Sequence, residues 1–261
     1  MDLKEQNWNN FTANHLHDWH GIWTRYTPQG QVKESFQSLR SFKSNPELTE
    51  IHQTNRYIYS SDNIKEESWD YNQQENSLAD GVFHPSRSTM RGFFLVSGYA
   101  VWVSTQLETG SYLGAELFFR NDDLRHSVGI VYDDKGNLFR TANIREDCTG
   151  FPSQYWSTKI NQLSERNLTG NWQGNSVTIT SDLHISTPVP TQLNWGWEGH
   201  KIFFLPDGVS ISFPEMVRIG TPFTLVANWL MNPSNLQQLL VKYDSSGAFS
   251  SLTLELFKLS D

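Results

Sequence analysis

From Gly21 onward the chain consists of short runs rich in Phe, Val, Ile, Tyr and Thr, separated at close intervals by turn-forming residues. Such residues favour strands, and turns at this spacing join neighbouring strands into hairpins. No run between the turns has the length and pattern of the crossover helix that a parallel sheet requires. The sequence therefore predicts an all-β chain, with about nine strands in residues 21–146 and about eight in residues 171–258. The turns are Pro28-Gln29-Gly30, Asp80-Gly81, Glu108-Thr109-Gly110, Asn121-Asp122-Asp123, Asp133-Asp134-Lys135-Gly136, Asp207-Gly208 and Ser245-Ser246-Gly247.

A helical pattern precedes the first strand. Trp8, Phe11, His15 and Trp19 recur at spacings of three or four residues, which would place them on one face of a helix. We therefore expect one short amphipathic helix over residues 6–19.

The two halves of the chain carry similar motifs in the same order, which predicts an internal duplication. Each half opens with Trp-x-Gly, at Trp19-His20-Gly21 and at Trp172-Gln173-Gly174. We expect two tandem antiparallel β-barrels, one over residues 1–160 with the helix and a smaller, degenerate one over 165–261, joined by a linker near 147–168. One large sandwich with coincidental turns is the alternative. The other matched pairs are Leu78–Val82 with Leu205–Val209, Arg91-Gly92 with Arg218-Ile219-Gly220, and Tyr132–Gly136 with Tyr243–Gly247.

The order of helix, Gly21-Ile22-Trp23 and β-meander resembles the lipocalin or, more broadly, the calycin barrel. In that family a short helix closes the base of the barrel and the Trp of Gly-x-Trp packs under an Arg near the end of the last strand. The resemblance implies that Gly21, Trp23 and the neighbouring Trp19 form the barrel base. Arg140 is the best match to the family's Arg, and Arg145 is the second. The second half departs from the pattern, because no Trp follows Gly174 in the corresponding place.

The run N-H-x-x-x-W-H-G-x-W-x-x-Y-x-P-x-G, which begins at Asn14, and the paired-barrel length are similar to an uncharacterised family of cyanobacteria and plastids with two lipocalin-like halves. This resemblance covers the whole chain and implies a fold without an activity. Related single-barrel proteins are the phycobilin lyases, which hold an open-chain tetrapyrrole and deliver it to a cysteine of a phycobiliprotein.

Composition excludes several kinds of partner. The net charge of −8 and the pI of about 5.5 argue against nucleic acid and anionic membranes as partners. The single cysteine, Cys148, cannot form an internal disulfide, which favours a reducing compartment. The N-terminus has no apolar signal segment, and no apolar run reaches the roughly 20 residues needed to span a bilayer. We expect a soluble, cytoplasmic protein.

Three histidines near the start raise the question of a metal site. His15 and His17 would point in nearly opposite directions on a helix, so they cannot share an ion. Glu146 and Asp147 beside Cys148 would raise the pKa of its thiol, which disfavours a nucleophilic role. No hydrolase, phosphate-loop or dinucleotide motif occurs. The sequence thus predicts neither a metal site nor a catalytic constellation, and it does not identify a cofactor.

Charged residues on otherwise apolar strand faces are the best candidates for a ligand site. Side chains on a strand alternate between its two faces, so each face can be followed in steps of two residues. If the faces containing the charges point inward, the first barrel has an aromatic lining with a few polar groups, as binding cavities do. Exposure of the same faces to solvent is the alternative. The candidates are Arg40, Glu116, Arg120, His126 and Arg140 within the barrel, Trp102 as an aromatic wall, and Arg87 and Arg91 at the rim.

Three functions are compatible with these features. A binding module would hold a small hydrophobic and acidic molecule, such as a tetrapyrrole, carotenoid or fatty acid, in the first barrel. An enzyme of the bilin lyase or isomerase kind would use Glu116 or His126 as an acid or base. A structural or assembly factor would present two filled barrels to a protein partner. The visible aromatic lining and the lack of a catalytic motif favour the binding module.

Overall fold

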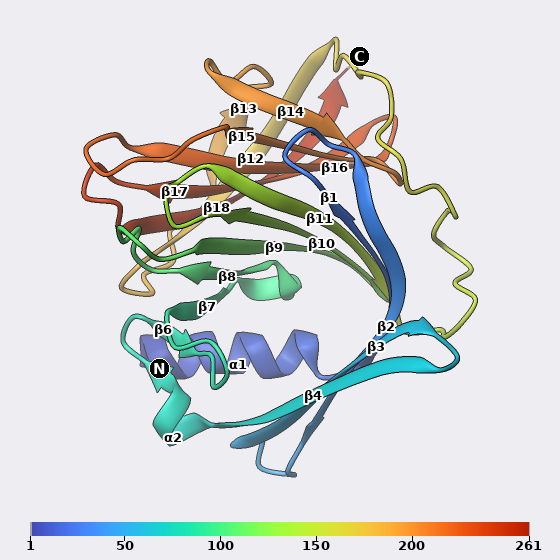
Figure 1. The fold of residues 1–261 in the computed structure, drawn as a ribbon. Coiled ribbons are helices and arrows are strands. Elements are labelled where there is room, and N and C mark those ends of the chain that lie inside the picture. Colours follow the sequence, from blue (N-terminus) through green and yellow to red (C-terminus); the bar gives the residue numbers. More distant parts are fainter. Residues whose placement is uncertain (1, 261) are drawn as a thin grey trace.

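Two antiparallel β-sheets stacked on one another form most of the protein in the computed structural model, which describes residues 2–260 (Figure 1). The prediction of an all-β chain that begins with a short helix is confirmed. Among the described residues, helical structure is limited to α1 (Leu3–His15), the single turn of α2 (Gln73–Asn76) and a 3-10 turn, η1 (Val96–Gly98). None of these helices combines the length and hydrophobicity needed to cross a lipid bilayer.

Helix α1 is shorter at its C-terminal end than the sequence pattern predicts. Trp8, Phe11 and His15 are buried on one face of the helix, as expected. The backbone N–H of His17 then donates to the carbonyl of His15 (3.0 Å), and the chain turns into the first strand. Trp19 therefore lies on a strand rather than on the helix, although its side chain is buried in the same cluster as Trp8 and Phe11.

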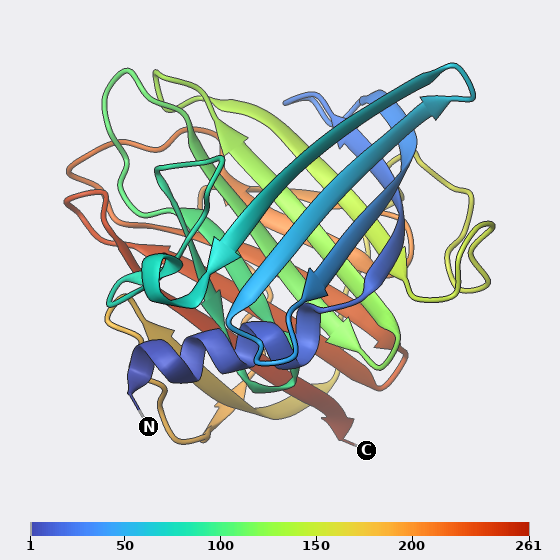
Figure 2. The same ribbon diagram turned by 90° about the horizontal axis from the view of Figure 1, so that it is seen from below.

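The first sheet contains eleven strands: β1 (Asp18–Tyr26), β2 (Val32–Ser44), β3 (Glu50–Ser60), β4 (Asn63–Asn72), β5 (Ser77–Leu78), β6 (Gly81–Phe83), β7 (Met90–Phe94), β8 (Ala100–Ser104), β9 (Leu113–Asn121), β10 (Leu124–Tyr132) and β11 (Leu138–Asp147). Their spatial order is β4-β3-β2-β1-β11-β10-β9-β8-β7-β6-β5. The sheet is strongly curved, the long β3–β4 ribbon extends beyond the rest of it, and α1 crosses one end of the curve (Figure 2).

The second sheet contains seven strands: β12 (Asn171–Thr180), β13 (Val189–Gln192), β14 (His200–Phe204), β15 (Val209–Pro214), β16 (Phe223–Asn232), β17 (Asn235–Tyr243) and β18 (Phe249–Ser260). Their order is β13-β12-β18-β17-β16-β15-β14. This sheet covers the outer side of the first sheet in the region of β8 to β11 (Figure 1).

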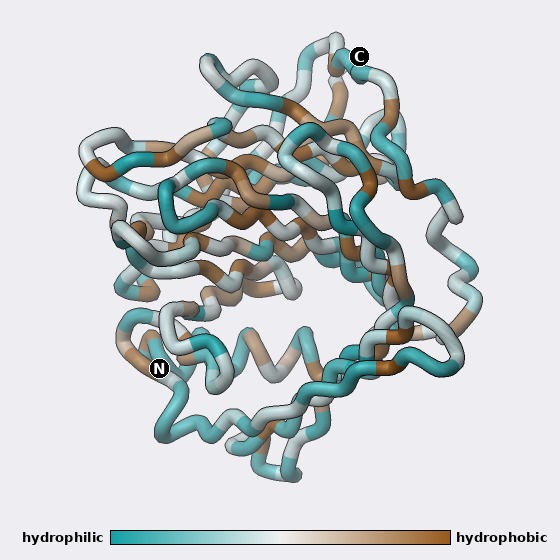
Figure 3. The backbone as a smooth tube through the Cα atoms, in the orientation of Figure 1, coloured by the Kyte–Doolittle hydropathy of each residue, from teal (hydrophilic) through white to brown (hydrophobic). Residues whose placement is uncertain are grey.

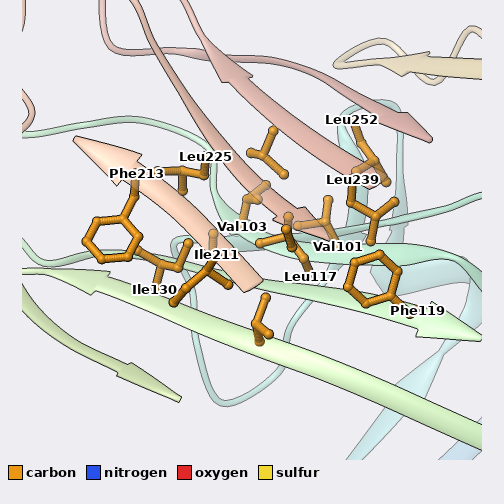
Figure 4. Close-up of a cluster of buried hydrophobic side chains, with 14 of the residues drawn as sticks. Val101, Val103, Leu117, Phe119, Ile130, Ile211, Phe213, Leu225, Leu239 and Leu252 are labelled. Carbon is orange, nitrogen blue, oxygen red and sulfur yellow. The ribbon is translucent and has the colours of Figure 1, made fainter. Parts of the chain in front are cut away.

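The largest hydrophobic cluster lies between the two sheets. Val101, Leu117 and Ile130 project from the first sheet and meet Ile211 and Leu239 of the second, and all five are fully buried (Figure 4). Hydrophobic residues are accordingly concentrated where the sheets stack, whereas the β3–β4 ribbon is largely hydrophilic (Figure 3). Because strand side chains alternate, an apolar outer face on β8 to β10 leaves the inner face available for other residues.

The two halves of the chain exchange equivalent contacts where they meet. The hydroxyl of Tyr132 donates to the carbonyl of Pro214 (2.7 Å), and the hydroxyl of Tyr243 donates to the carbonyl of Ser104 (2.9 Å). Four backbone hydrogen bonds follow the same reciprocal scheme: Leu138 N to Glu215 O, Val217 N to Gly136 O, Phe249 N to Thr105 O, and Leu107 N to Gly247 O. Each half therefore places a loop against the last hairpin of the other half.

These contacts correct one detail of the expected duplication, the match of Asp80-Gly81 with Asp207-Gly208. The turn at Asp207-Gly208 directly precedes β15, the strand that ends at Pro214. The turn in the same position before Ser104 is Ser97-Gly98. Ser97 and Asp207 both have positive φ, at 72° and 60°. Asp80-Gly81 instead joins the short strands β5 and β6, which lie at the end of the first sheet.

Asn7 of α1 takes the place of a strand partner for β7. Its side-chain amide donates to the carbonyl of Gly92 (3.0 Å), and its side-chain oxygen accepts from the backbone N–H of Phe94 (2.8 Å). The carboxamide thus forms the same pair of bonds that a neighbouring strand would form, and Asn7 is buried. This interaction attaches the helix to the sheet.

We expect Asn7→Leu to lower the free energy of unfolding by about 2–4 kcal/mol, because two buried backbone groups lose their partner at about 1–3 kcal/mol each. Chemical denaturation would measure this. The matched control is Asn14→Ala, which removes a bond from the Asn14 amide to the carbonyl of Asn10 within the helix. Equal losses in the two variants would contradict the role of Asn7 as an edge partner.

Candidate functional site

A cavity of about 660 Å³ lies on the inner side of the curved first sheet. Its walls come from β1 to β4 on one side and β8 to β11 on the other, with the segment 84–90 at the mouth. Phe11 and His15 of α1 also line it, so the helix that crosses the end of the sheet closes this end of the cavity (Figure 2). The volume lies within the range of about 300–1,000 Å³ typical of small-molecule sites.

A buried ionic cluster lies beside the closed end. Glu146 has no exposed surface, and its two oxygens accept hydrogen bonds from Arg40 at 2.5 and 2.6 Å. Arg125 donates to the same carboxylate at 2.7 Å, and Arg40 also reaches Glu116 at 3.1 Å. Two arginines are thus neutralised by two glutamates, which makes burial of these charges possible.

The glycine of the Gly-x-Trp motif provides space for this cluster. Gly21 on β1 is opposite Glu146 on β11. A Cβ atom at Gly21 would lie 2.8 Å from Cγ of Glu146 and 2.9 Å from Oγ of Ser38. Any larger residue at position 21 would therefore displace the carboxylate from the position in which it binds both arginines.

The surroundings determine the charge states in the cluster. Burial alone would raise the pKa of Glu146, but Arg125 and Arg40 outweigh this effect and hold it below its usual value. Burial lowers the pKa of Arg125 to about 10, which leaves it protonated at neutral pH. Burial, together with Arg125, lowers the pKa of His15 well below its usual value, so this histidine is neutral.

Two donors at the closed end of the cavity have no partner among the described residues. Nη2 of Arg125 and Nε2 of His15 are both buried and unpaired, although Nη1 of Arg125 lies 3.4 Å from Nδ1 of His15. Both residues line the cavity. A buried donor without a partner is costly, and a bound molecule or ordered water would satisfy it.

Aromatic rings form two walls of the cavity. On one side Trp23 stacks on Phe36 with ring centroids 5.8 Å apart, and Tyr57 meets Trp23 edge-on at 5.6 Å. On the other side the ring centroid of His84 lies 5.0 Å from the ring centroids of both Trp69 and Trp102. Burial, with Arg87 nearby, lowers the pKa of His84 to about 4, so it is neutral at pH 7. Such walls suit a flat, apolar molecule.

Arginines gather at the mouth of the cavity. Arg87 and Arg140 line it, and no ion pair involves either of them within residues 2–260. Burial is the main cause of the lowered pKa of Arg140, and the nearby charges of Arg25 and Arg87 lower it further. Arg25 is paired with Glu34 at 2.7 Å. The mouth therefore carries two cations without a carboxylate partner.

The structure places five of the predicted ligand-site residues around this one cavity: Arg40, Trp102, Glu116, Arg140 and Arg87. The other three lie elsewhere. Arg120 lies over the ring of Trp19, 4.5 Å from its centroid, and Arg91 is paired with Asp80 at 3.2 Å. His126 is on the opposite face of the sheet, bonded to Asn143 and packed against Trp156 and Trp229. Burial lowers its pKa to about 4.

The structure also changes the expected roles of the two tryptophans. Trp19, which has no exposed surface, is the one packed at the base, and its indole N–H donates to the carbonyl of His15 (3.1 Å). Trp23 is half-buried in the cavity wall, where Arg40 lies 5.3 Å from its ring centroid. Arg140 does not cover Trp23, because its guanidinium lies against Phe139 at the mouth.

Arg145, the second candidate for that role, faces away from the cavity. Its guanidinium is buried and pairs with Asp207 of the second half at 2.6 Å. It also donates to the carbonyl of Ser157 (2.8 Å). Arg145 thus connects the first sheet to the linker and the second sheet.

Sequence reasoning missed Arg125 and Glu146 as parts of the site. Glu146 could have been found, because steps of two residues from Arg140 along the same strand reach it. Arg125 belongs to the face of β10 that contains Ser127, Gly129 and Val131. That face is less apolar than its opposite, which contains His126, and the more apolar face was expected to point inward.

The three N-terminal histidines diverge in space. His17 packs on Trp19 and His20 on Phe151, whereas His15 faces the cavity. Within residues 2–260 no group of three or more His, Cys, Asp or Glu side chains is arranged to hold a metal ion. Cys148 is half-buried outside the cavity, and burial raises the pKa of its thiol.

Fold and site together define an all-β protein in which a curved antiparallel sheet surrounds an arginine-rich cavity. The family described as "Domain of unknown function (DUF3598), N-terminal" matches residues 4–151, more than half of the chain. The chain belongs to the DUF3598 family, which confirms the family resemblance inferred from its N-terminal motif. A second pattern, "Biogenesis factor required for ATP synthase 1, C-terminal domain", matches residues 195–256.

Solved structures include one with the same overall fold. A DUF3598 protein of unknown function from Nostoc punctiforme is 19% identical with a TM-score of 0.74, and the match covers 97% of this chain and 99% of that one. An S-type phycobiliprotein lyase, CPES, from Guillardia theta is 11% identical with a TM-score of 0.38, covering 56% of this chain and 94% of that one. None of the curated proteins matches this chain.

Proposed function

We propose that the first sheet acts as a lipocalin-like barrel, closed at one end by α1, that binds a small hydrophobic molecule with an acidic group. The acid lies at the mouth beside Arg87 and Arg140, and the apolar body lies between the walls formed by Trp23 and Trp102. Two buried donors without a partner among the described residues, on Arg125 and His15, lie at the closed end. Tetrapyrroles, carotenoids with an acidic group and fatty acids have this combination of groups.

The charge of the cavity is the observation that carries this proposal. The chain has a net charge of −8, yet five arginines and only two glutamates line the cavity. Positive side chains still outnumber negative ones when Glu146, directly behind the wall, is counted as well. A concave site with a charge opposite to that of the whole protein attracts anions and excludes cations.

We propose in addition that the second half is a duplicated barrel that supports the first one. Trp172 on β12 corresponds to Trp19, because each precedes the glycine that lies opposite the last strand of its half. Trp172 packs on Leu236 and Phe257. These two residues hold the paired strand positions in the second half that Arg125 and Glu146 hold beside Trp19 in the first half. The second half thus has an apolar cluster where the first half has its ionic cluster, and it stabilises the fold.

Binding can be tested with the purified chain and two probes, palmitic acid and biliverdin. Trp23 and Trp102 in the walls should report either ligand by quenching of tryptophan fluorescence. Native mass spectrometry should show one bound molecule per chain. Wild-type protein that binds neither probe and carries no small molecule after purification would contradict the proposal. Chemical conversion of bound biliverdin would instead assign the chain as an enzyme.

We expect Arg87→Ala and Arg140→Ala to weaken binding of palmitic acid by about 10-fold or more each, the effect of losing one charge-assisted hydrogen bond. Neither arginine has an ion-pair partner to lose in the described part of the chain, so the melting temperature should stay unchanged. Arg218→Ala, an exposed arginine of the second half, is the matched control. Unchanged affinity in the two mouth variants would show that the acidic group of the ligand does not bind at this position.

A further inference from the structure

A line of polar side chains runs along the inner face of β3. Gln53, Asn55 and Tyr57 occupy every second position and therefore share one face of the strand. Gln53 and Asn55 are each only 6% exposed. Amides buried this deeply in a strand face need partners.

These side chains form a continuous hydrogen-bonded chain that begins on β4. The indole N–H of Trp69 donates to the hydroxyl of Tyr71 (2.9 Å), and this hydroxyl donates to Oε1 of Gln53 (3.0 Å). Nε2 of Gln53 donates to Oδ1 of Asn55 (2.9 Å), and Nδ2 of Asn55 donates to the hydroxyl oxygen of Tyr57 (3.1 Å).

Trp69 fixes the direction of the whole chain, because an indole can donate a hydrogen bond but cannot accept one. Tyr71 must therefore accept from Trp69 and use its own proton for Gln53. The orientation of both amides follows, and each turns its NH₂ group toward Tyr57. Hydrogen bonds aligned in one direction polarise one another, which strengthens the last donor.

The last donor is the hydroxyl of Tyr57, and no acceptor for its proton is found in the described part of the chain. Tyr57 lines the cavity, and its ring is held against Trp23 and Phe36. Burial raises the pKa of Tyr57, so the proton is present at neutral pH. Arg40, whose charge acts on Tyr57, cannot accept this proton because a guanidinium only donates, and its own donors are used by Glu146 and Glu116.

We infer that the Tyr57 hydroxyl is a ligand-recognition group, which donates to a carbonyl oxygen in the body of the bound molecule. This inference rests on the proposed function and narrows the ligand class. Because the neighbouring ionic cluster is internally neutral, the acceptor is an uncharged carbonyl rather than a second carboxylate. The ligand thus combines an acid at the mouth, a flat apolar body and a carbonyl along it.

The test compares two ligands and two tyrosine variants by isothermal titration calorimetry. Biliverdin has lactam carbonyls as well as propionates, whereas palmitic acid has only its carboxylate. We expect Tyr57→Phe to weaken binding of biliverdin about 3- to 10-fold, the effect of one lost hydrogen bond, and to leave palmitic acid unchanged. Tyr59→Phe is the matched control, because Tyr59 lies on the same strand and is an exposed residue.

A third variant tests the direction of the chain. Without the indole donor in Trp69→Phe, the hydrogen bonds can run either way, and the Tyr57 proton points into the cavity in about half of the molecules. The effect of Tyr57→Phe on biliverdin should therefore be about half as large in that background. The same effect in both backgrounds would show that Trp69 does not direct the donor.

The outcomes separate this inference from the proposed function. Wild-type protein that binds palmitic acid but not biliverdin, or biliverdin affinity that Tyr57→Phe leaves unchanged, would overturn the role of Tyr57 and leave the acid-binding cavity standing. Failure of the wild-type protein to bind either probe would overturn both.

Discussion

Replacement of Glu146 by Gln should lower the free energy of unfolding by about 3–5 kcal/mol, because it leaves buried arginines without their carboxylate. Gln keeps the shape of the side chain, so the loss of stability measures the contribution of the negative charge. Arg40 keeps a contact with Glu116, whereas no other carboxylate pairs with Arg125 within residues 2–260. Urea denaturation at neutral pH would measure the difference from wild type.

Glu66→Gln is the matched control, since Glu66 is exposed on β4 and forms no ion pair among the described residues. We expect its effect to be within about 0.5 kcal/mol. If Glu146→Gln is equally mild, the two arginines are stabilised without the carboxylate, and the ionic cluster does not support the fold.

The pH dependence of the same variant provides a second check. The folded protein holds the pKa of Glu146 below its usual value of 4.5, so the stabilisation is complete above that value. It is lost as the pH falls below 4.5 and the folded protein takes up the proton. The difference in stability between wild type and Glu146→Gln should therefore be constant near neutral pH and shrink in acid. A difference independent of pH would exclude the charge as its cause.

Trp19→Ala should cost about 3–5 kcal/mol, the range for truncation of a fully buried aromatic residue. The indole also contacts the guanidinium groups of Arg125 and Arg120, 4.3 and 4.5 Å from its ring centroid. Its loss therefore opens a void and removes the surface on which the arginines lie. Thermal unfolding followed by circular dichroism would detect this change.

Trp23→Ala serves as the comparison, because Trp23 belongs to the same motif but is half-buried in the cavity wall. We expect a smaller loss of stability and a larger loss of ligand affinity than for Trp19→Ala. If Trp23 proved the more important residue for stability, the base of the sheet would have been assigned to the wrong tryptophan.

The sequence was sufficient to predict the elements whose cause is local. Hairpin turns such as Asp133–Gly136 depend on residues that accept turn geometry, and this turn closes through bonds from Gly136 to Asp133 and from Asp133 to Asn137. Alternation along β2 and β9 assigned Arg40 and Glu116 to inward faces, and both residues line the cavity. Both depend on neighbours along a single strand.

The side of each strand that faces the cavity could not be predicted in the same way. Alternation separates the residues of β10 into two sets but does not say which set faces inward. The set with His126 is the more apolar one, and it faces the second sheet, whereas the faces of the first barrel were assigned without reference to the second half. Glu146 and Arg125 were missed for a related reason, since a buried charge is recognisable only once its partner from a distant strand is known.

The position of the hydrophobic core outside the cavity has a consequence for how this family can diversify. In a simple barrel the same inward residues must both hold the fold together and recognise the ligand, so a change of ligand endangers the fold. Here the apolar contacts between the two sheets stabilise β8 to β10 from behind, as Val101, Leu117 and Ile130 show. Inward residues of these strands away from the ionic cluster are therefore free to drift during evolution. Under the proposed binding function, the family could therefore change its ligand while it keeps the same architecture.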